Sequence, residues 1–169
     1  MNKQLEQICT KPAPMYSAEK TRTLLQNIFE EKGWQYECQE NGALLVTYQG
    51  EHFVIEFSDD GCHFRIWDLG WHEVALENLA NFALVRTAVN ECNLSPYAVV
   101  MYGIDNEEKV MRIHTKRDVE WFHLISDLKF YLQNALDSML SVHHHFYQIM
   151  ERLRQDEYAK NNDIGFVSK

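Results

Sequence analysis

The stretch from Val119 to Leu153 constrains the fold of this 169-residue chain most, because it contains neither glycine nor proline. Its apolar residues recur at spacings of three and four, which predicts an amphipathic helix. A single helix over this range would be about 50 Å long, which exceeds the diameter of a domain of this size. The helix must therefore break, near Ser141–His144, or bury its far end against a further surface of this chain or of another.

The second half of this apolar stripe is the strongest functional hint in the sequence. Core packing accounts for the stripe up to Leu140, whereas its continuation needs a partner surface, either within this chain or on another. An apolar stripe of that size facing solvent usually marks an interface. We therefore predict contacts with a second copy or another protein through Val142, Phe146, Ile149, Met150 and Leu153.

Upstream, between Leu44 and Ile66, the apolar residues recur with a period of two, which predicts β-strands. Gln49-Gly50 and Asp60-Gly61 separate three such runs and suit tight hairpin turns. Two-residue turns there put one set of apolar residues on a single face, as the pairs Val46–Phe53, Ile55–Ile66 and Phe57–Phe64. A two-residue turn at Asn41-Gly42 would put the apolar residues of a strand at 34–38 on the opposite face, so either that turn is longer or the strand is partly covered on both sides.

The remaining elements complete an α+β fold in the order α-ββββ-α-ββ-α, with an antiparallel sheet packed by helices. A helix over 17–32 is capped by Ser17 and Gly33. A second helix is predicted over 72–92, followed by a hairpin with strands at 97–103 and 110–115. The domain covers 17–155, between an N-terminal arm at 1–16 that contains two prolines and a polar, flexible tail at 156–169.

The same hairpin register gives the meander a second face, which carries Arg65 and Trp67. Glu56 lies opposite Arg65 on this face, and Val54 lies opposite Trp67. One interpretation is a peptide-binding patch with Trp67 and Arg65 as anchors, since both residue types are enriched at interface hot spots. The alternative is a cross-strand Glu56–Arg65 ion pair worth less than about 1 kcal/mol, with Trp67 under a helix.

Two segments could carry chemistry, the run His143–His145 and the loop Asp68–Glu73. Consecutive helical residues point about 100° apart, whereas a helical zinc pair needs histidines at i and i+4. The loop could build an acid–base site, or could begin a helix with Glu73 near the positive end of the helix dipole. No nucleophile elbow, phosphate loop, dinucleotide motif or paired-cysteine motif occurs. We predict no catalytic residue, metal or cofactor, and do not expect an enzyme.

Composition narrows the class of partner and the compartment. A formal net charge of −9 argues against nucleic acid, which requires clustered lysine and arginine. No apolar run approaches the roughly 20 residues that span a bilayer, so we expect no membrane segment. The four cysteines are widely spaced, as in a protein of the reducing cytoplasm.

The order of elements resembles the YbjN family, whose fold is that of the type III secretion chaperones. The resemblance rests on the hairpin series from 40–43 through 61–66, on the helix from Leu79 to Asn93, and on the strand at 97–101. It covers roughly residues 17–140. It implies a non-catalytic protein, because secretion chaperones form dimers and hold an extended partner segment, and it carries over no catalytic residues.

Together these observations predict a cytoplasmic protein-binding or chaperone-like module that acts as a homodimer. A small hydrolase or metal-dependent enzyme that uses the loop histidines, aspartate and glutamate is the first alternative. A structural subunit of a larger assembly is the second.

Overall fold

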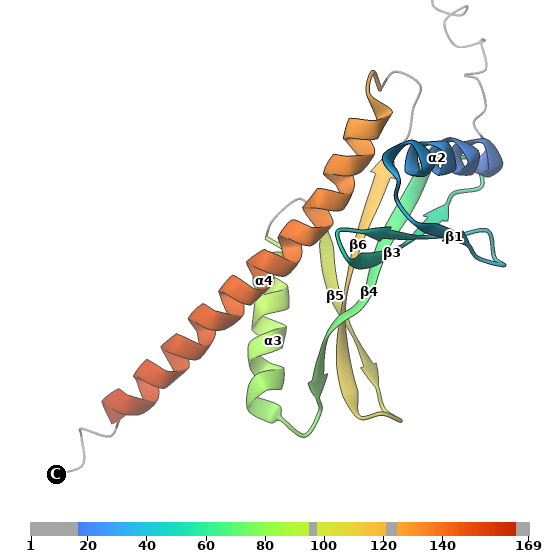
Figure 1. Ribbon diagram of the computed structural model, residues 1–169. Helices are drawn as coiled ribbons and strands as arrows, with labels where there is room; N and C mark the ends of the chain where they lie inside the picture. Colours follow the sequence, from blue (N-terminus) through green and yellow to red (C-terminus); the bar gives the residue numbers. More distant parts are fainter. Residues whose placement is uncertain (1–16, 95–97, 121–124, 165–169) are drawn as a thin grey trace, which may run out of the picture.

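The computed structural model describes residues 17–94, 98–120 and 125–164, and it confirms the predicted α+β class and order of elements. Six antiparallel strands form one sheet with the order β1-β2-β3-β4-β6-β5. They are β1 (Tyr36–Cys38), β2 (Leu44–Tyr48), β3 (Glu51–Phe57), β4 (His63–Ala75), β5 (Val99–Asp105) and β6 (Val110–Glu120). The described helices are α2 (Ala18–Lys32), α3 (Leu79–Cys92) and α4 (Leu128–Ile164) (Figure 1). The predicted arm at 1–16 lies outside the described residues.

The meander has the predicted register. Val46 pairs with Phe53, Ile55 with Ile66 and Phe57 with Phe64. Gln49 and Gly50 both have positive φ, as a two-residue type I′ turn requires. The first turn is longer than two residues, since Gln39 N–H donates to Ala43 and Tyr36 pairs with Val46. This places β1 in register with the core face.

Local chemistry fixes the ends of the helices. The Ser17 side chain accepts a hydrogen bond from the Lys20 N–H, and Gly33 closes α2 in the left-handed conformation. Asn78 caps the start of α3 in the same way as Ser17 caps α2. The Phe130 N–H donates to the Asp127 carboxylate at the start of α4, 2.9 Å away.

Two predicted helix starts were wrong, at residue 72 and at Val119. β4 continues to Ala75 and β6 to Glu120, because the two strands pair with each other along their length. The pairing is interrupted once, between Asp68 and His72, by a bulge in which Gly70 has a φ of 69°. Pairing in this ladder extends both strands beyond the residues at which the apolar periodicity alone predicted helix starts.

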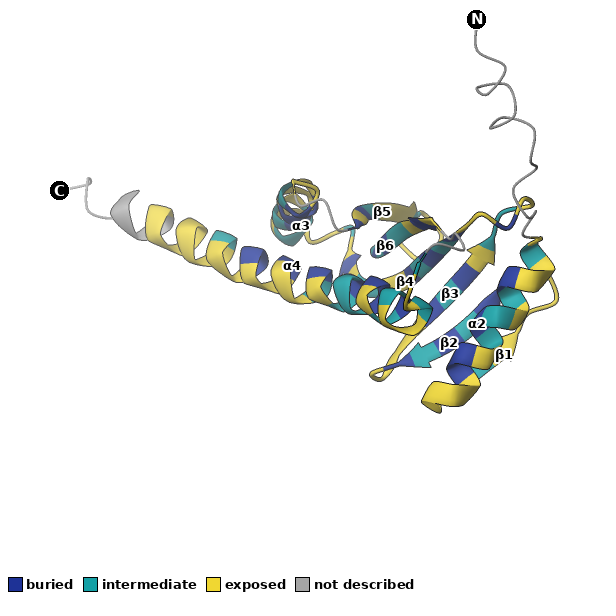
Figure 2. Cartoon of the chain, turned by 90° about the horizontal axis from the view of Figure 1, so that it is seen from above, coloured by how far each residue is buried: buried dark blue, intermediate teal, exposed yellow. Residues whose placement is uncertain are grey.

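The helix α4 has 37 residues and no break near Ser141–His144. It crosses the helix-covered side of the sheet, packs across α3 at an angle, and extends beyond every other element (Figures 1 and 2). It also continues to Ile164, past Asp156 where the tail was expected to begin. No helix in the described part of the chain is long and apolar enough to cross a membrane.

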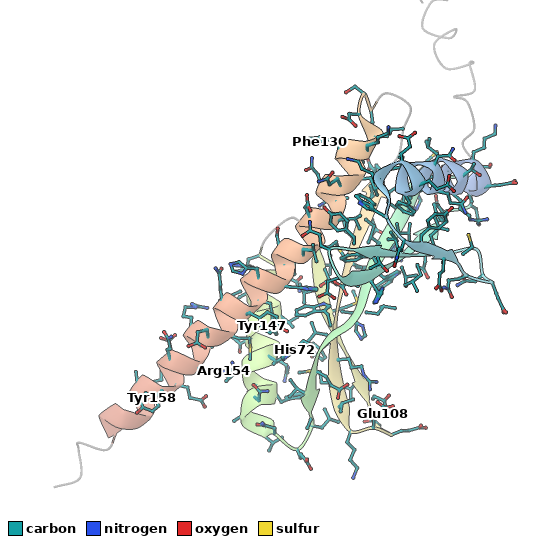
Figure 3. All side chains as sticks on the ribbon, viewed as in Figure 1. His72, Glu108, Phe130, Tyr147, Arg154 and Tyr158 are labelled. Carbon is teal, nitrogen blue, oxygen red and sulfur yellow. The ribbon has the colours of Figure 1, made fainter. Side chains whose placement is uncertain are left out.

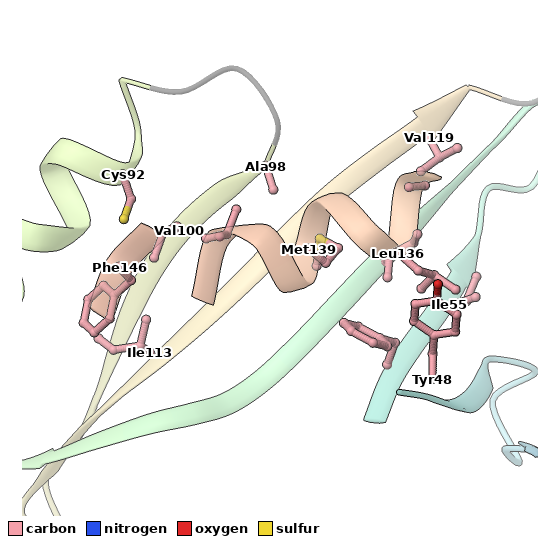
Figure 4. Packing of buried hydrophobic residues seen from close by; sticks show 14 of the residues in the cluster. Tyr48, Ile55, Cys92, Ala98, Val100, Ile113, Val119, Leu136, Met139 and Phe146 are labelled. Carbon is pink, nitrogen blue, oxygen red and sulfur yellow. The ribbon is translucent and has the colours of Figure 1, made fainter. Parts of the chain in front are cut away.

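The core lies between one face of the sheet and the helices. Strand residues such as Ile55 and Ile113 meet Val85 of α3 and the α4 residues Met139 and Phe146 there, all fully buried (Figure 4). Burying one such side chain contributes about 1.5–3 kcal/mol.

Candidate partner-binding face

The face of the sheet opposite the core is the first candidate site. In β3, Phe53 and Ile55 are buried, whereas Val54 and Glu56 between and beside them are not. The same alternation holds in β2, in β4 up to Asp68 and in β6 up to Thr115, whereas β5 has a single buried residue, Val100. No outward side chain on these strands is buried among the described residues. We call this surface the open face.

One row of side chains crosses the open face from strand to strand. Cα pairing in each ladder aligns Leu45, Val54, Trp67, Lys116 and Val99 over five strands. Strands lie about 4.8 Å apart, so this cross-sheet row is about 19 Å long. Four of its five members are apolar, and Val99 at its end is 48% exposed.

Trp67 at the centre of the row is held by polar neighbours. Its indole N–H donates to Glu56 Oε2 at 2.7 Å. The Arg65 guanidinium lies 5.6 Å from the ring centroid and the Lys116 ammonium 5.9 Å, both within cation–π range. A ring held in this way loses less conformational entropy when a partner covers it.

The ion pair on this face differs from the predicted one. Glu56 lies opposite Arg65 in the ladder, but the Arg65 Nε donates to Asp118 Oδ1 at 2.6 Å, and Glu56 binds Trp67 instead. The hydrogen bond from Arg65 lowers the pKa of Asp118 and raises that of Arg65. Both side chains are well exposed, so the pair contributes less than about 1 kcal/mol to folding. The predicted anchors Arg65 and Trp67 are therefore adjacent on the open face, and no described helix covers Trp67.

The second candidate site is the bulge of β4, which corresponds to the predicted loop Asp68–Glu73. Asp68 is 3% exposed, and its Oδ2 lies 2.7 Å from Nε2 of His143 on α4. Neither atom is aligned for a hydrogen bond, so the contact is a close electrostatic approach. The Trp71 ring stacks on His143 at 4.2 Å and donates to the buried Thr115 hydroxyl at 3.0 Å.

His72, next to Trp71 in the chain, lies against Tyr147 of α4 (Figure 3). Its Nδ1 is 3.4 Å from the Tyr147 hydroxyl, while its Nε2 is buried without a hydrogen-bond partner in the described structure. Burial lowers the pKa of His72, and the nearby Arg154 lowers it further. A neutral histidine packed in this way stabilises the contact between β4 and α4.

The central pair of this second cluster is largely buried. The Asp68 side chain is 4% exposed and the His143 side chain 14%, which leaves a substrate little access. His144 and His145 are exposed and point elsewhere, so the histidine run does not converge, as predicted. Among the described residues, no three histidine, cysteine, aspartate or glutamate side chains are grouped closely enough to hold a metal ion.

The predicted contact residues on α4 lie against other elements of the same chain. Val142, Phe146, Ile149 and Met150 are between 0% and 7% exposed, because α3 and the sheet of the same chain cover them. Leu153 is partly buried against the same core. The surface needed by the far half of the stripe is therefore intramolecular. The sequence could not reveal this, since helix α3 packs on α4 from about 60 residues upstream.

No protein-family model matches this chain, and no curated protein matches it. Solved structures do match, and three of them are each 14% identical to it. An uncharacterized protein from Methanothermobacter thermautotrophicus has a TM-score of 0.50, over 78% of this chain and 98% of its own. YbjN from E. coli has a TM-score of 0.51, over 86% and 96%. The Yersinia pestis type III secretion chaperone SycH, solved with a fragment of YscM2, has a TM-score of 0.43, over 72% and 94%.

These likenesses define the fold. The described chain has the YbjN-like α+β architecture that the order of elements predicted. At 14% identity the comparison extends to the fold alone, and the likeness to SycH is too weak to carry an argument about this chain.

Proposed function

We propose that this chain is a non-catalytic protein-binding module that holds a partner on its open face. The observation that supports this most is the cross-sheet row centred on Trp67, which is apolar, ordered and uncovered by any described element. Aromatic and arginine side chains are the residues that most often dominate binding energy at interfaces. A partner that covers Trp67 would also shield its contacts with Glu56 and Arg65 from water.

Cross-linking from the open face tests this proposal. A photoreactive amino acid placed at Val54 or Val99 should give a discrete cross-linked species in cells that make the protein. The same group at Phe130, which is 62% exposed on α4, should not. Trp67→Ala should lower the yield at Val99 several-fold. Equal cross-linking at Phe130, or no discrete species from either open-face position, would refute binding by this face.

A homodimer, a cytoplasmic location and the domain limits 17–155 remain part of the proposal. The described structure assigns no surface to a homodimer, because the α4 stripe is buried in its own chain. Native mass spectrometry gives the answer directly: twice the chain mass supports a dimer, and the chain plus a second polypeptide supports a heterologous partner. A structural subunit would instead copurify in a fixed assembly that does not exchange its subunits.

A further inference from the structure

The edge strand β5 is closed at one end by a side chain and open at the other. The Asn93 side chain accepts from the Val100 N–H and donates to the Val100 carbonyl, both at 2.8 Å. The Asn93 amide thus occupies the place that a neighbouring strand would take. Both backbone groups of Val100 consequently point away from β6, although Val100 lies opposite Thr115 in the ladder.

The backbone groups of the next residues of β5 follow from the direction of those of Val100. In an antiparallel ladder every second residue directs both its N–H and its C=O to the same neighbour. Tyr102 and Ile104 therefore also direct their backbone groups outward, and none of the described residues takes them. Their side chains are 39% and 48% exposed. Such an edge favours the addition of another strand.

A pocket of about 540 Å³ lies beside this open stretch. It is lined by Gly103, Ile104, Asp105, Asn106, Glu107, Arg112 and His114. Gly103 leaves room on the open face of the sheet where every other residue type would place a side chain. A residue added opposite Gly103 would direct its own side chain into this space, because paired residues share a face.

The charges at the pocket favour a basic side chain. The basic residues that line the pocket are Arg112 and His114. The Arg112 guanidinium already binds three carboxylates, those of Glu73, Asp105 and Glu108. Figure 3 shows Glu108 at the tip of this hairpin. Burial and the charge of Arg112 lower the pKa of His114, which keeps it neutral at pH 7. Three carboxylates around one guanidinium leave a net negative charge that a lysine or arginine would complement.

A second copy of this chain fits the edge less well. Two-fold antiparallel pairing about Tyr102 would set each Ile104 against Val100 of the other copy, where Asn93 already lies. That register would displace two Asn93 hydrogen bonds in each chain, whereas pairing about Gly103 would set Gly103 against Gly103 of the other copy and leave the pocket without a side chain. A short foreign strand over 102–104 displaces none of them.

From these contacts we propose that β5 accepts an extended segment of a partner protein at Tyr102 and Ile104, with a lysine or arginine in the pocket beside Gly103. The inference rests on the proposed function only in requiring a protein partner, because it assigns a contact surface separate from Trp67. The segment would complete the sheet as a seventh strand and would make up to four backbone hydrogen bonds.

A capped pentapeptide tests this, with threonine at positions one and five, valine at positions two and four, and lysine at position three, so that it spans the stretch opposite 101–105 and does not reach Val100. In ¹⁵N-correlation spectra of the full chain, the peptide should shift the amide signals of Tyr102 and Ile104. A glutamate in place of the lysine, or N-methylation on either side of it, should weaken binding by at least about tenfold, the equivalent of one or two hydrogen bonds.

Ile104→Pro removes an outward N–H and leaves the β6 ladder intact, and edge strands tolerate proline. It should weaken peptide binding as N-methylation does. The control Ile104→Thr keeps the N–H and the branched side chain and should bind nearly as well as the native chain. Equal binding of the lysine and glutamate peptides, signals that shift around Trp67 only, or a free-protein dimer that Ile104→Pro abolishes would each overturn the inference. Loss of binding in Trp67→Ala alone bears on the open face and leaves β5 unaffected.

Discussion

Ile149→Asp distinguishes a buried α4 stripe from an exposed partner surface. Ile149 is 6% exposed between α4 and α3, so the substitution removes about 2–3 kcal/mol of apolar burial. The new carboxylate would lie beside a surface groove whose basic lining residues are His145 and Arg152. The total loss should be at least about 4 kcal/mol, a large part of the 5–15 kcal/mol typical of a domain.

Urea denaturation followed by tryptophan fluorescence measures this loss, with native mass recorded on the same samples. Ile149→Ala should cost about 2–4 kcal/mol without burying a charge. Gln148→Asp is the matched control, because Gln148 is exposed and adjacent, and it should change stability by less than about 0.5 kcal/mol. An Ile149→Asp protein with native stability but half the native mass would refute the intramolecular packing of this stripe.

Three further substitutions test particular contacts. Because burial lowers the pKa of His72, the unfolded chain takes up a proton first as the pH falls below about 6.5. Stability should therefore decrease from pH 7 to pH 5 in urea titrations, and less so in His72→Gln. Gly42→Ala and Gly33→Ala should lower the melting temperature by similar amounts, because both positions have positive φ and a Cβ at Gly42 would meet only the movable end of the Arg22 side chain. Thr115→Val leaves the Trp71 N–H without its acceptor and should cost about 1–3 kcal/mol in the same urea assay.

The meander could be predicted from the sequence because its information is local. A period of two, interrupted by Gln49-Gly50 and Asp60-Gly61, determines which residues pair, and a shift of one residue would move every apolar side chain to the wrong face. The same logic placed Arg65 and Trp67 together. It could not place Asp118, because β6 joins β4 from about 50 residues away, and Asp118 displaces Glu56 as the partner of Arg65.

The bulge of β4 could not be predicted, for a related reason. Leu76, Leu79 and Phe82 continue a helical period back towards Gly70, and a single glycine does not distinguish a bulge from a helix start. The ladder with β6 decides the outcome, since Val74 and Ala75 pair with Met111 and Val110. Trp71, which follows the bulge, stacks on His143 and thereby connects the sheet to α4.

The contacts between the sheet and α4 bear on which surfaces of the molecule remain uncovered. The helix α4 is attached to the core face by Asp68, Trp71 and His72. Because α3 covers the apolar stripe of α4, the residues of this stripe are buried within the chain. Apolar side chains on α3 and α4, such as Leu79 and Phe130, remain exposed, and the sheet leaves further apolar surface uncovered in the row through Trp67 and along β5. Both surfaces belong to strands held rigidly by the β4–β6 ladder. Rigid strands suit a binding module, because ordering a partner against a preformed surface costs less free energy than ordering both sides.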